Sequence, residues 1–310
     1  MLNGKDLISI HDLSVDEVYQ ILDFAAELKA LQKAGVPHRL LEGKTLGMIF
    51  EKSSTRTRVS FEVGIFQLGG TGLFLSNRDL QLGRGEPIKD TARVLSRYLD
   101  GIMIRTFGHE RILELAKFAD VPIINGLSDL LHPCQVLTDL LTIREFKGKN
   151  LRSLKMAYVG DGNNMTNSYL YGAAKVGMTL AVATPENYKP DETVFRNAIA
   201  DADATGANLS WTEDPAEAVR DADIIATDTW ASMGQEAEHD ARTKIFMPYQ
   251  VNDELLQHAS KNVIVMHCLP AYRGEEVTEE VFEKNADVIF EEAENRLHVQ
   301  KAIMALTMTD

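Results

Sequence analysis

TLGMIFEKSSTRTRVSFEVGIFQLGG, residues 45–70, joins a predicted buried strand to a predicted helix through a polar turn. The apolar run at 45–50 is typical of a strand, and the pattern at 59–68 is typical of a helix. The turn at 51–58 carries two arginines, one lysine and four hydroxyl groups beside a single acid. Helix N-termini present unpaired N–H groups and partial positive charge, so this unit predicts a site for an anion.

The turn also has a simpler interpretation, as a solvated helix start with surface arginines. It lacks the pattern G-x-x-x-x-G-K-[ST], so it gives no sign of nucleotide triphosphate binding. For an anion, Ser54, Thr55 and Thr57 would offer hydroxyl donors. Arg56 would add a guanidinium fork that can bind an oxyanion through two bonds.

The composition is that of a globular chain with an acidic surface. Of 310 residues, 45% are hydrophobic and 25% are charged, and the net charge of -14 argues against general binding to nucleic acid or anionic membranes. No apolar stretch is long enough to span a bilayer, and the N-terminus lacks the pattern of a secretion signal. Two cysteines, Cys134 and Cys268, are too few for a disulfide scaffold and have no zinc-site spacing, which predicts a cytoplasmic protein without a metal.

Strand and helix patterns alternate along the chain, as is typical of α/β proteins with parallel sheets covered on both faces. A polar, basic run at 147–155 interrupts the alternation, which then restarts. We therefore predict two doubly wound parallel-sheet domains, the first covering 1–146 and the second beginning at 147, with an active-site cleft between them. The predicted strands are 45–50, 71–76, 101–105, 121–125, 156–160, 179–184, 208–212, 223–228 and 263–269.

Three further features of the first half suit an anion site. Arg105 ends a predicted strand, and ligands of α/β proteins bind at the carboxyl ends of parallel strands. His132 precedes a helix that Pro133 begins, a place that favours the neutral imidazole, although a histidine there is more often a structural cap. The polar loop at 76–87 contains Gln81 and would either close over an anion or form mobile surface.

Together these motifs resemble the carbamoyl-phosphate domain of the aspartate/ornithine carbamoyltransferase family. The resemblance extends over nearly the whole chain, with the motifs in the family's order. It rests on STRTR (54–58), GEPIKDTARVLSRY (85–98), Arg105 and HPCQ (132–135).

The end of the chain is also similar to this family. EAENRLHVQKAIM, residues 292–304, resembles the family's last helix. The resemblance implies that the helix at 293–310 packs back on the first domain and brings Arg296 to the carbamoyl-phosphate site. The second domain is then 147–292.

The second half opens on YVGDGNNMTNS, residues 158–168, between a predicted strand and a helix. Its turn lacks the third glycine of a dinucleotide-binding fingerprint, and Glu186 lies late for the ribose acid, so a nicotinamide-dependent dehydrogenase is the weaker alternative. Asn163 and Asn164 offer amides that suit a carboxylate or another small polar group.

Two later strand ends carry DTWASMGQE (228–236) and HCLPAYRGEE (267–276). Asp228 would hold an ammonium group or simply cap a turn. Cys268 would exchange a proton or simply pack as a small hydrophobic residue. Both segments look like the ornithine branch of the family.

The resemblance implies transfer of the carbamoyl group of carbamoyl phosphate to the side-chain amine of L-ornithine, giving L-citrulline and phosphate. Cys268, Arg105 and His132 would be catalytic, with Cys268 accepting the proton of the amine, and no metal or organic cofactor is needed. The implied carbamoyl-phosphate site consists of Ser54, Thr55, Arg56, Thr57, Gln81, Arg105, His132, Gln135, Cys268, Leu269 and Arg296. The implied ornithine site consists of Asn164, Asp228, Ser232 and Met233.

The resemblance also implies a homotrimer, in which the loop around Gln81 reaches a neighbour's site. Such an enzyme would serve arginine biosynthesis or, in reverse, arginine breakdown, and both directions use the same site. A phosphate- or amino-acid-binding protein without activity is the alternative from outside enzymology. That alternative does not explain why a thiol, an aspartate and a set of oxyanion donors should occur together.

Overall fold

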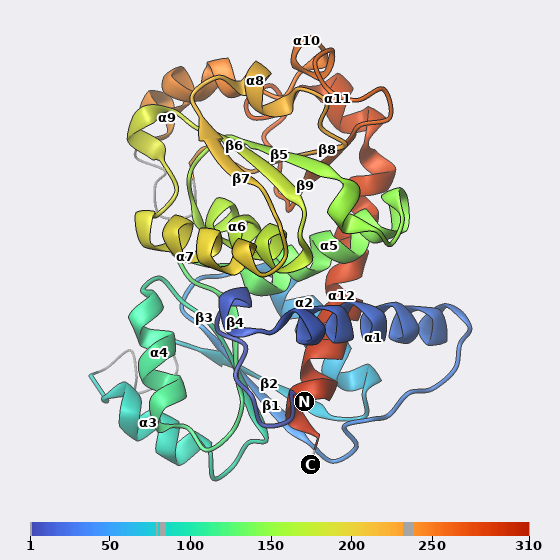
Figure 1. Ribbon diagram of the computed structural model, residues 1–310. Coiled ribbons are helices and arrows are strands. Elements are labelled where there is room, and N and C mark those ends of the chain that lie inside the picture. The colour runs from blue at the N-terminus through green and yellow to red at the C-terminus, as the bar shows by residue number, and fades with distance from the viewer. Residues whose placement is uncertain (1, 79, 81–84, 232–237, 310) are drawn as a thin grey trace. The chain divides into compact units, whose positions relative to one another are not determined.

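The computed structural model describes residues 2–78, 80, 85–231 and 238–309 of the chain (Figure 1). These residues form two compact units. Unit 1 consists of Met1–Leu141 and Asn295–Asp310, and unit 2 consists of Thr142–Glu294. The boundaries fall inside two helices, α5 (Pro133–Lys147) and α12 (Ala286–Met308).

Unit 1 is built on a four-stranded parallel sheet with the strand order β2-β1-β3-β4. The first three strands occupy the residues that the sequence predicts, and the fourth lies two residues further along the chain. The strands are β1 (Thr45–Phe50), β2 (Thr71–Ser76), β3 (Gly101–Arg105) and β4 (Ile123–Leu127).

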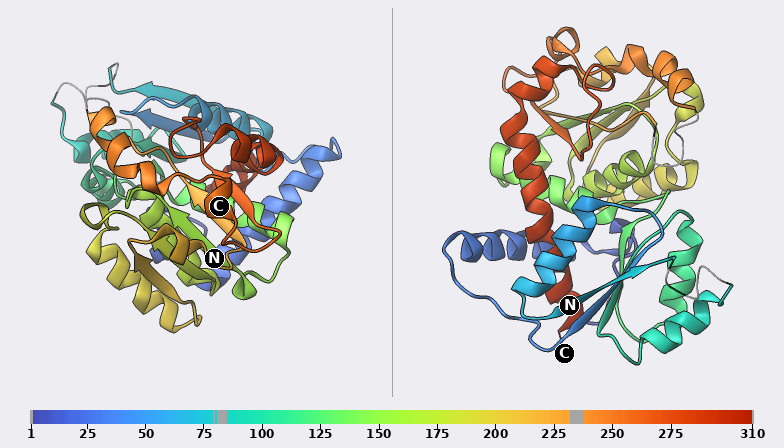
Figure 2. Two further views of the ribbon diagram at one scale, coloured as in Figure 1. Left: turned by 90° about the horizontal axis from the view of Figure 1, so that it is seen from above. Right: turned by 180° about the vertical axis from the view of Figure 1, so that it is seen from behind.

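Helices cover both faces of this sheet (Figures 1 and 2). One face packs Ile49, Ile102 and Ile104 against Ile112 and Leu115 of α4. The opposite face is covered by α2 and by the part of α12 that belongs to unit 1. Besides α5 and α12, the helices of unit 1 are α1 (Val15–Lys33), α2 (Thr55–Gln67), α3 (Ile88–Leu95) and α4 (His109–Phe118).

Helix α2 begins four residues before its predicted start. Ser54 is the N-cap, and its hydroxyl oxygen accepts a hydrogen bond from the backbone N–H of Thr57 at 3.2 Å. The first turn is polar, so the apolar pattern used for the prediction could not detect it. The hydroxyl-rich turn is therefore the first turn of the helix itself.

Helices α2 and α12 approach each other closely at Gly64. A Cβ atom at this position would lie 2.9 Å from Met304 Cε and 3.3 Å from Lys301 Cγ. Any larger residue would push the two helices apart or displace these side chains. Glycine therefore allows α12 to lie directly on α2.

Unit 2 is built on a five-stranded parallel sheet with the strand order β7-β6-β5-β8-β9. This order reverses direction between β5 and β8, as in other doubly wound sheets. The strands are β5 (Lys155–Val159), β6 (Thr179–Ala183), β7 (Leu209–Thr212), β8 (Ile224–Thr227) and β9 (Ile264–His267).

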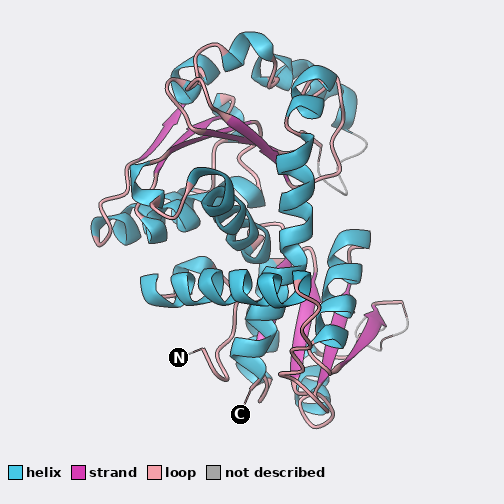
Figure 3. Ribbon diagram, turned by 90° about the vertical axis from the view of Figure 1, so that its right-hand side faces the viewer, coloured by secondary structure: helices cyan, strands magenta, loops and turns pink. Residues whose placement is uncertain are grey.

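Helices again lie on both sides of the sheet in unit 2 (Figure 3). Ala157 and Val159 of β5 pack on one side against Val219 of α8, Val281 of α11 and Ile289 of α12. The helices of unit 2 are α6 (Asn164–Val176), α7 (Glu192–Asp203), α8 (Pro215–Val219), α9 (His239–Phe246), α10 (Asp253–Leu256) and α11 (Glu279–Lys284). In the described part of the chain, no helix combines the length and apolar character that a bilayer-spanning segment needs.

A buried lysine ties α12 to its neighbours in unit 1. Lys301 Nζ donates to Gln67 Oε1 at 3.0 Å and lies 3.0 Å from His38 Nε2. His38 Nδ1 lies 2.9 Å from the carbonyl oxygen of Val36, which can only accept, so Nε2 is the ring atom that accepts from Lys301. Burial lowers the pKa of Lys301 from 10.5 to about 8.

Replacing Lys301 by methionine would test this lowered pKa. Between pH 8 and pH 10.5 the unfolded chain holds a proton that native Lys301 has released, so the stability of the wild type rises with pH in this window. Relative to Lys301→Met, we expect the wild type to gain about 3 kcal/mol of unfolding free energy across it, measured by urea titration at each pH. Lys89→Met, which removes an exposed charge from the same unit, is the control. A pH-independent difference between the wild type and Lys301→Met would contradict the lowered pKa.

Candidate active site

The buried hydroxyl group of Thr57 is the meeting point of three side chains in unit 1. Its Oγ1 accepts from Arg296 Nη2 at 2.9 Å, from Ser54 Oγ at 3.2 Å and from Arg105 Nη1 at 3.4 Å. Arg105 is the last residue of β3, and Arg296 lies on α12. Two buried guanidinium groups therefore meet at the N-terminus of α2, an arrangement that favours a bound anion.

His132 lies just before α5 and is buried in the same unit. Burial, and then the positive charges of Arg296, Arg105 and Arg56, hold the pKa of His132 well below its usual value of 6.5. The direction agrees with the neutral imidazole expected from the sequence. The causes in the structure are burial and nearby arginines, whereas the sequence predicted the neutral form from the N-terminus of the helix that follows His132. A neutral ring can donate a hydrogen bond to a developing negative charge while keeping its proton.

The side chain of Gln135, also on α5, lies between an arginine and a carboxylate. Arg296 Nη1 donates to Gln135 Oε1 at 2.5 Å, and Gln135 Nε2 donates to Asp139 Oδ1 at 2.8 Å. Gln135 is thus joined to the Thr57 cluster through Arg296. The sequence analysis did not identify Asp139, although residues four apart on a helix face the same side and a Gln–Asp pair at this spacing is a recognisable signal.

Two cations of the 51–58 turn take no part in the Thr57 cluster. Lys52 pairs with Asp129. Arg58 pairs with Glu62 at 3.1 Å and lies over the ring of Phe74, 3.8 Å from its centroid. For Arg58, the simpler interpretation as a surface arginine is correct.

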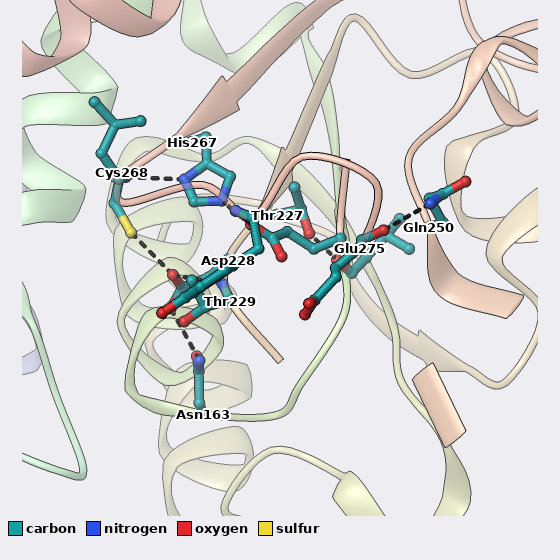
Figure 4. A network of polar contacts seen from close by, with 12 residues as sticks. Asn163, Thr227, Asp228, Thr229, Gln250, His267, Cys268 and Glu275 are labelled. Carbon is teal, nitrogen blue, oxygen red and sulfur yellow. Dashed lines mark hydrogen bonds and ion pairs between the residues drawn. The ribbon is translucent and has the colours of Figure 1, made fainter. Parts of the chain in front are cut away.

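In unit 2, a thiol and a carboxylate lie at the carboxyl ends of two neighbouring strands (Figure 4). Cys268 follows β9 directly, and its Sγ donates to Asp228 Oδ1 at 3.2 Å. Asp228 follows β8 and is largely buried. Its Oδ2 accepts from Asn163 Nδ2 at 3.0 Å, and its Oδ1 accepts from the backbone N–H of Thr229 at 2.8 Å. The carboxylate is therefore held in one orientation beside the thiol.

The two asparagines of the 158–168 stretch have different roles. Asn163 is the N-cap of α6, and its Oδ1 accepts from the backbone N–H of Met165 at 2.9 Å. This cap leaves its Nδ2 to orient Asp228, a contact that the sequence analysis did not predict. Asn164 is the first residue of α6.

Hydrogen bonds also fix the backbone around Cys268. The N–H of Leu269, whose φ of 60° is in the left-handed region, donates to His267 Nδ1 at 2.8 Å. Since Nδ1 accepts, the proton of the ring is on Nε2, which lies 3.0 Å from Glu276 Oε1. His267 and Glu276 are both buried, and the sequence analysis assigned no role to either. Together they hold the turn that carries the thiol.

The glycine turn after β5 does not have the form of a dinucleotide site. A Cβ atom at Gly162 would lie 2.3 Å from the carbonyl oxygen of Tyr188, and the N–H of Gly162 donates to that oxygen at 2.9 Å. Glycine is required there because another segment of the chain packs against the turn. Glu186, the proposed ribose acid, instead pairs with Lys189 at 2.6 Å. These contacts argue against the dehydrogenase alternative.

Some predicted site residues cannot be placed. Gln81, Ser232 and Met233 lie outside the described residues. Thr55 is exposed at the start of α2, and Arg56 is half-buried beside it.

Over the described part of the chain, histidine, cysteine and acidic side chains do not gather in groups of three or more that could hold a metal ion.

The fold and the site geometry indicate an α/β group-transfer enzyme, with an anion site in one unit and a thiol–carboxylate pair in the other. Comparison with known protein families shows which family of such enzymes this chain resembles. Residues 5–145 match the carbamoyl-phosphate-binding domain of aspartate/ornithine carbamoyltransferases, and residues 152–307 match their aspartate/ornithine-binding domain. The chain belongs to the aspartate/ornithine carbamoyltransferase family.

Individual relatives are similar to this chain over nearly their whole length. The ornithine carbamoyltransferase of Carboxydothermus hydrogenoformans is 59% identical over 98% of both chains, and that of Thermococcus kodakarensis is 57% identical over 99% of this chain and 97% of its own. The solved structure of the Pyrococcus furiosus ornithine carbamoyltransferase superposes with a TM-score of 0.96 at 54% identity, covering 99% of this chain and 98% of that one. The Campylobacter jejuni anabolic enzyme gives 0.91 at 47% identity, covering 96% and 97%.

The Thr57 cluster can be tested with inorganic phosphate as the ligand. Arg296→Met removes one of the two guanidinium groups on Thr57, so we expect the affinity for phosphate to fall about 10- to 100-fold, measured by isothermal titration calorimetry. Arg58→Met, which removes a charge from the same motif but outside the cluster, should change the affinity less than about threefold. Equal losses in the two variants would mean that phosphate responds to general charge and not to this cluster.

Proposed function

We propose that this enzyme transfers the carbamoyl group of carbamoyl phosphate to the side-chain amine of L-ornithine, giving L-citrulline and phosphate. The observation that carries the choice of acceptor is the contact between Cys268 and Asp228. A largely buried carboxylate beside a thiol suits an ammonium group that must lose a proton before it reacts. The same carboxylate would repel the side chain of aspartate, the acceptor in the other branch of the family.

The donor site proposed for unit 1 uses the residues around Thr57. Ser54, Thr55, Arg56 and the N-terminus of α2 would hold the phosphate group. Thr57, Arg105 and His132 would donate to the carbonyl oxygen, which becomes negative in the tetrahedral intermediate. Arg296 would bind carbamoyl phosphate beside these residues, and Gln135 would accept a hydrogen bond from the NH₂ of the carbamoyl group. Gln81, which lies outside the described residues, and Cys268 and Leu269, which belong to unit 2, complete the proposed donor set.

The proton transfer can be written from the contacts in unit 2. The ornithine amine is protonated at neutral pH and must become neutral to attack the carbamoyl carbon. We propose that Cys268 Sγ takes a proton from the amine while its own proton passes to Asp228 Oδ1, 3.2 Å away. Attack of the neutral amine forms the C–N bond and the tetrahedral intermediate. When this intermediate collapses, the C–O bond breaks, and phosphate leaves with the bonding electrons and takes up the second proton that the nitrogen must lose.

The amino-acid end of ornithine would be held by Asn164, Ser232 and Met233. Asn164 is at the first turn of α6, where the helix N-terminus favours a carboxylate. Ser232 and Met233 lie outside the described residues. Their assignment rests on the similarity of their segment to the ornithine branch of the family.

An assay of citrulline tests the whole proposal. The purified protein is supplied with carbamoyl phosphate and ornithine, with putrescine, acetylornithine and aspartate in parallel. We expect citrulline with a strong preference for ornithine. Product with another amine would retain the donor site and overturn the acceptor assignment. Tight carbamoyl-phosphate binding without product from any amine would favour a binding protein without activity.

Substitution of the two cysteines tests the proton transfer. Cys268→Ala should lower kcat about 100-fold or more, because it removes the proton acceptor. Cys134→Ser is the matched control, since burial raises the pKa of that thiol to about 12 and its Sγ donates to the backbone carbonyl oxygen of Asn125 at 3.4 Å. If both variants lost activity equally, Cys268 would have no special role.

We also propose a homotrimer, supported by an apolar patch on unit 1. The patch combines one side of α2 with the edge strand β2, which contact each other. Such patches are typical of surfaces that other subunits cover. Its members and their exposed fractions are Val59 (50%), Val63 (37%), Phe66 (77%), Leu73 (43%) and Phe74 (38%).

Light scattering after gel filtration tests this assembly. We expect a mass of about three times the 34.5 kDa of one chain. Phe66→Glu should reduce the mass, because it places a charge in the centre of the patch. Ile199→Glu, at an exposed apolar residue on α7, should leave it unchanged. A monomer in the wild type would contradict the proposal.

The cellular setting that we propose is arginine biosynthesis in the cytoplasm. Neither Cys134 nor Cys268 forms a disulfide, as is usual in a reducing compartment. A Pyrococcus furiosus relative, 54% identical, is described as anabolic.

A further inference from the structure

We propose that Asp139 is a positioning residue that makes the donor site selective for a carbamoyl group over an acyl group of the same shape. It would do so by fixing which end of the Gln135 side-chain amide faces the ligand. The inference rests on the function proposed above, because it assumes that Gln135 contacts the carbamoyl amide.

Three side chains that differ in the hydrogen bonds they can make meet at Gln135. A guanidinium group can only donate hydrogen bonds and an ionised carboxylate can only accept them, whereas an amide has one end of each kind. Gln135 lies between Arg296, 2.5 Å from Oε1, and Asp139, 2.8 Å from Nε2. The opposite orientation would set a donor against the guanidinium group and an acceptor against the carboxylate. The amide therefore has one stable orientation.

Burial makes this orientation strict. Gln135 and Asp139 are fully buried and Arg296 is 4% exposed, so water is poorly placed to replace a lost partner. A mismatched buried polar contact costs more than the same contact at the surface. The carboxylate and the guanidinium group also polarise the amide in the same direction, which makes Oε1 a stronger acceptor.

The orientation has a consequence for the ligand. Arg296 also donates to Thr57 Oγ1 at 2.9 Å, so Gln135 Oε1 belongs to the same cluster as the anion site. A carbonyl oxygen has two lone pairs, and an acceptor at this point matches the NH₂ of a carbamoyl group. A methyl group in its place offers no proton. With the methyl ligand, Gln135 Oε1 would be left without that donor. A buried polar group left unpaired in this way is the strongest basis for rejecting a ligand of the same shape.

Asp139 could instead act only by stabilising α5, and binding of matched ligands separates the two roles. Phosphonoacetamide is a stable isostere of carbamoyl phosphate, and acetonylphosphonate has the same shape with CH₃ in place of NH₂. Isothermal titration calorimetry would measure both ligands and inorganic phosphate on the full chain, without ornithine. The readout is the ratio of the two phosphonate affinities.

In the wild type we expect phosphonoacetamide to bind about 10- to 100-fold more tightly than acetonylphosphonate. Asp139→Asn replaces the carboxylate by an amide that can either accept from or donate to Gln135, so only Arg296 still favours the original orientation. We expect the ratio to fall about fivefold or more, with phosphate affinity changed less than about threefold. Thr138→Val, at a buried neighbour on the same helix, should keep the wild-type ratio.

The double variant Gln135→Glu with Asp139→Asn exchanges the two functional groups and conserves the total charge. The amide introduced at position 139 can then donate to one oxygen of the carboxylate introduced at position 135, and Arg296 can donate to the other. This arrangement restores an acceptor at the site. We expect the ratio to return to at least about one third of the wild-type value. This variant also carries the test if Asp139→Asn alone does not fold.

The outcomes separate this inference from the function on which it rests. If the wild type does not bind phosphonoacetamide, the proposed donor site itself is wrong. If it binds with the expected ratio but Asp139→Asn leaves that ratio unchanged, or lowers the affinity for all three ligands equally, Asp139 does not set selectivity. A double variant whose ratio stays about fivefold or more below the wild-type value would also overturn the proposal.

Discussion

The buried guanidinium group of Arg296 organises the cluster of polar side chains around Thr57 in unit 1. It donates to Thr57 at the N-terminus of α2 and to Gln135 on α5, residues 239 and 161 positions away in the chain. Each of these groups lies on a different element, so the cluster depends on the packing of α12 against α2. Gly64 allows that approach because it has no Cβ to separate the helices. This helix thus supplies one of the two guanidinium groups of the cluster, and, after burial, the charge of Arg296 helps to lower the pKa of His132.

In unit 2 the dominant constraint is the parallel sheet. Cys268 and Asp228 follow the neighbouring strands β9 and β8, so their side chains meet at one sheet edge. The surrounding bonds then fix how they meet. Asn163 orients the carboxylate, and His267 holds the turn that carries the thiol. These bonds orient the carboxylate and the turn, so the thiol and the carboxylate lie in hydrogen-bond contact, as the proposed proton transfer needs.

Much of the fold could be predicted because buried parallel strands are continuous apolar runs. The buried strands β1 and β3 begin and end at the predicted residues, and so does β2, an apolar edge strand that is partly exposed. The errors lie where the local pattern has another cause. Strand β4 continues through Gly126, since a Cβ there would lie 2.4 Å from Met103 Sδ, so this glycine serves packing and does not end the strand. Helix α12 begins at Ala286, before its predicted start at 293, and its first turns contain a short apolar run at 288–290 in which Ile289 packs in the core of unit 2.

The sequence by itself determined the order of strands and helices, the capped cationic turn, and the thiol and carboxylate at strand ends, because these depend on residues close together in the chain. The tertiary structure decided which of the cations join the cluster around Thr57. Arg58 pairs with Glu62 one helical turn away, whereas Arg296 reaches Thr57 across the sequence. It also decided the orientation of Gln135, because hydrogen-bond direction depends on partners on both sides of the amide. Burial, which gives these contacts their strength, is a property of the packed chain alone.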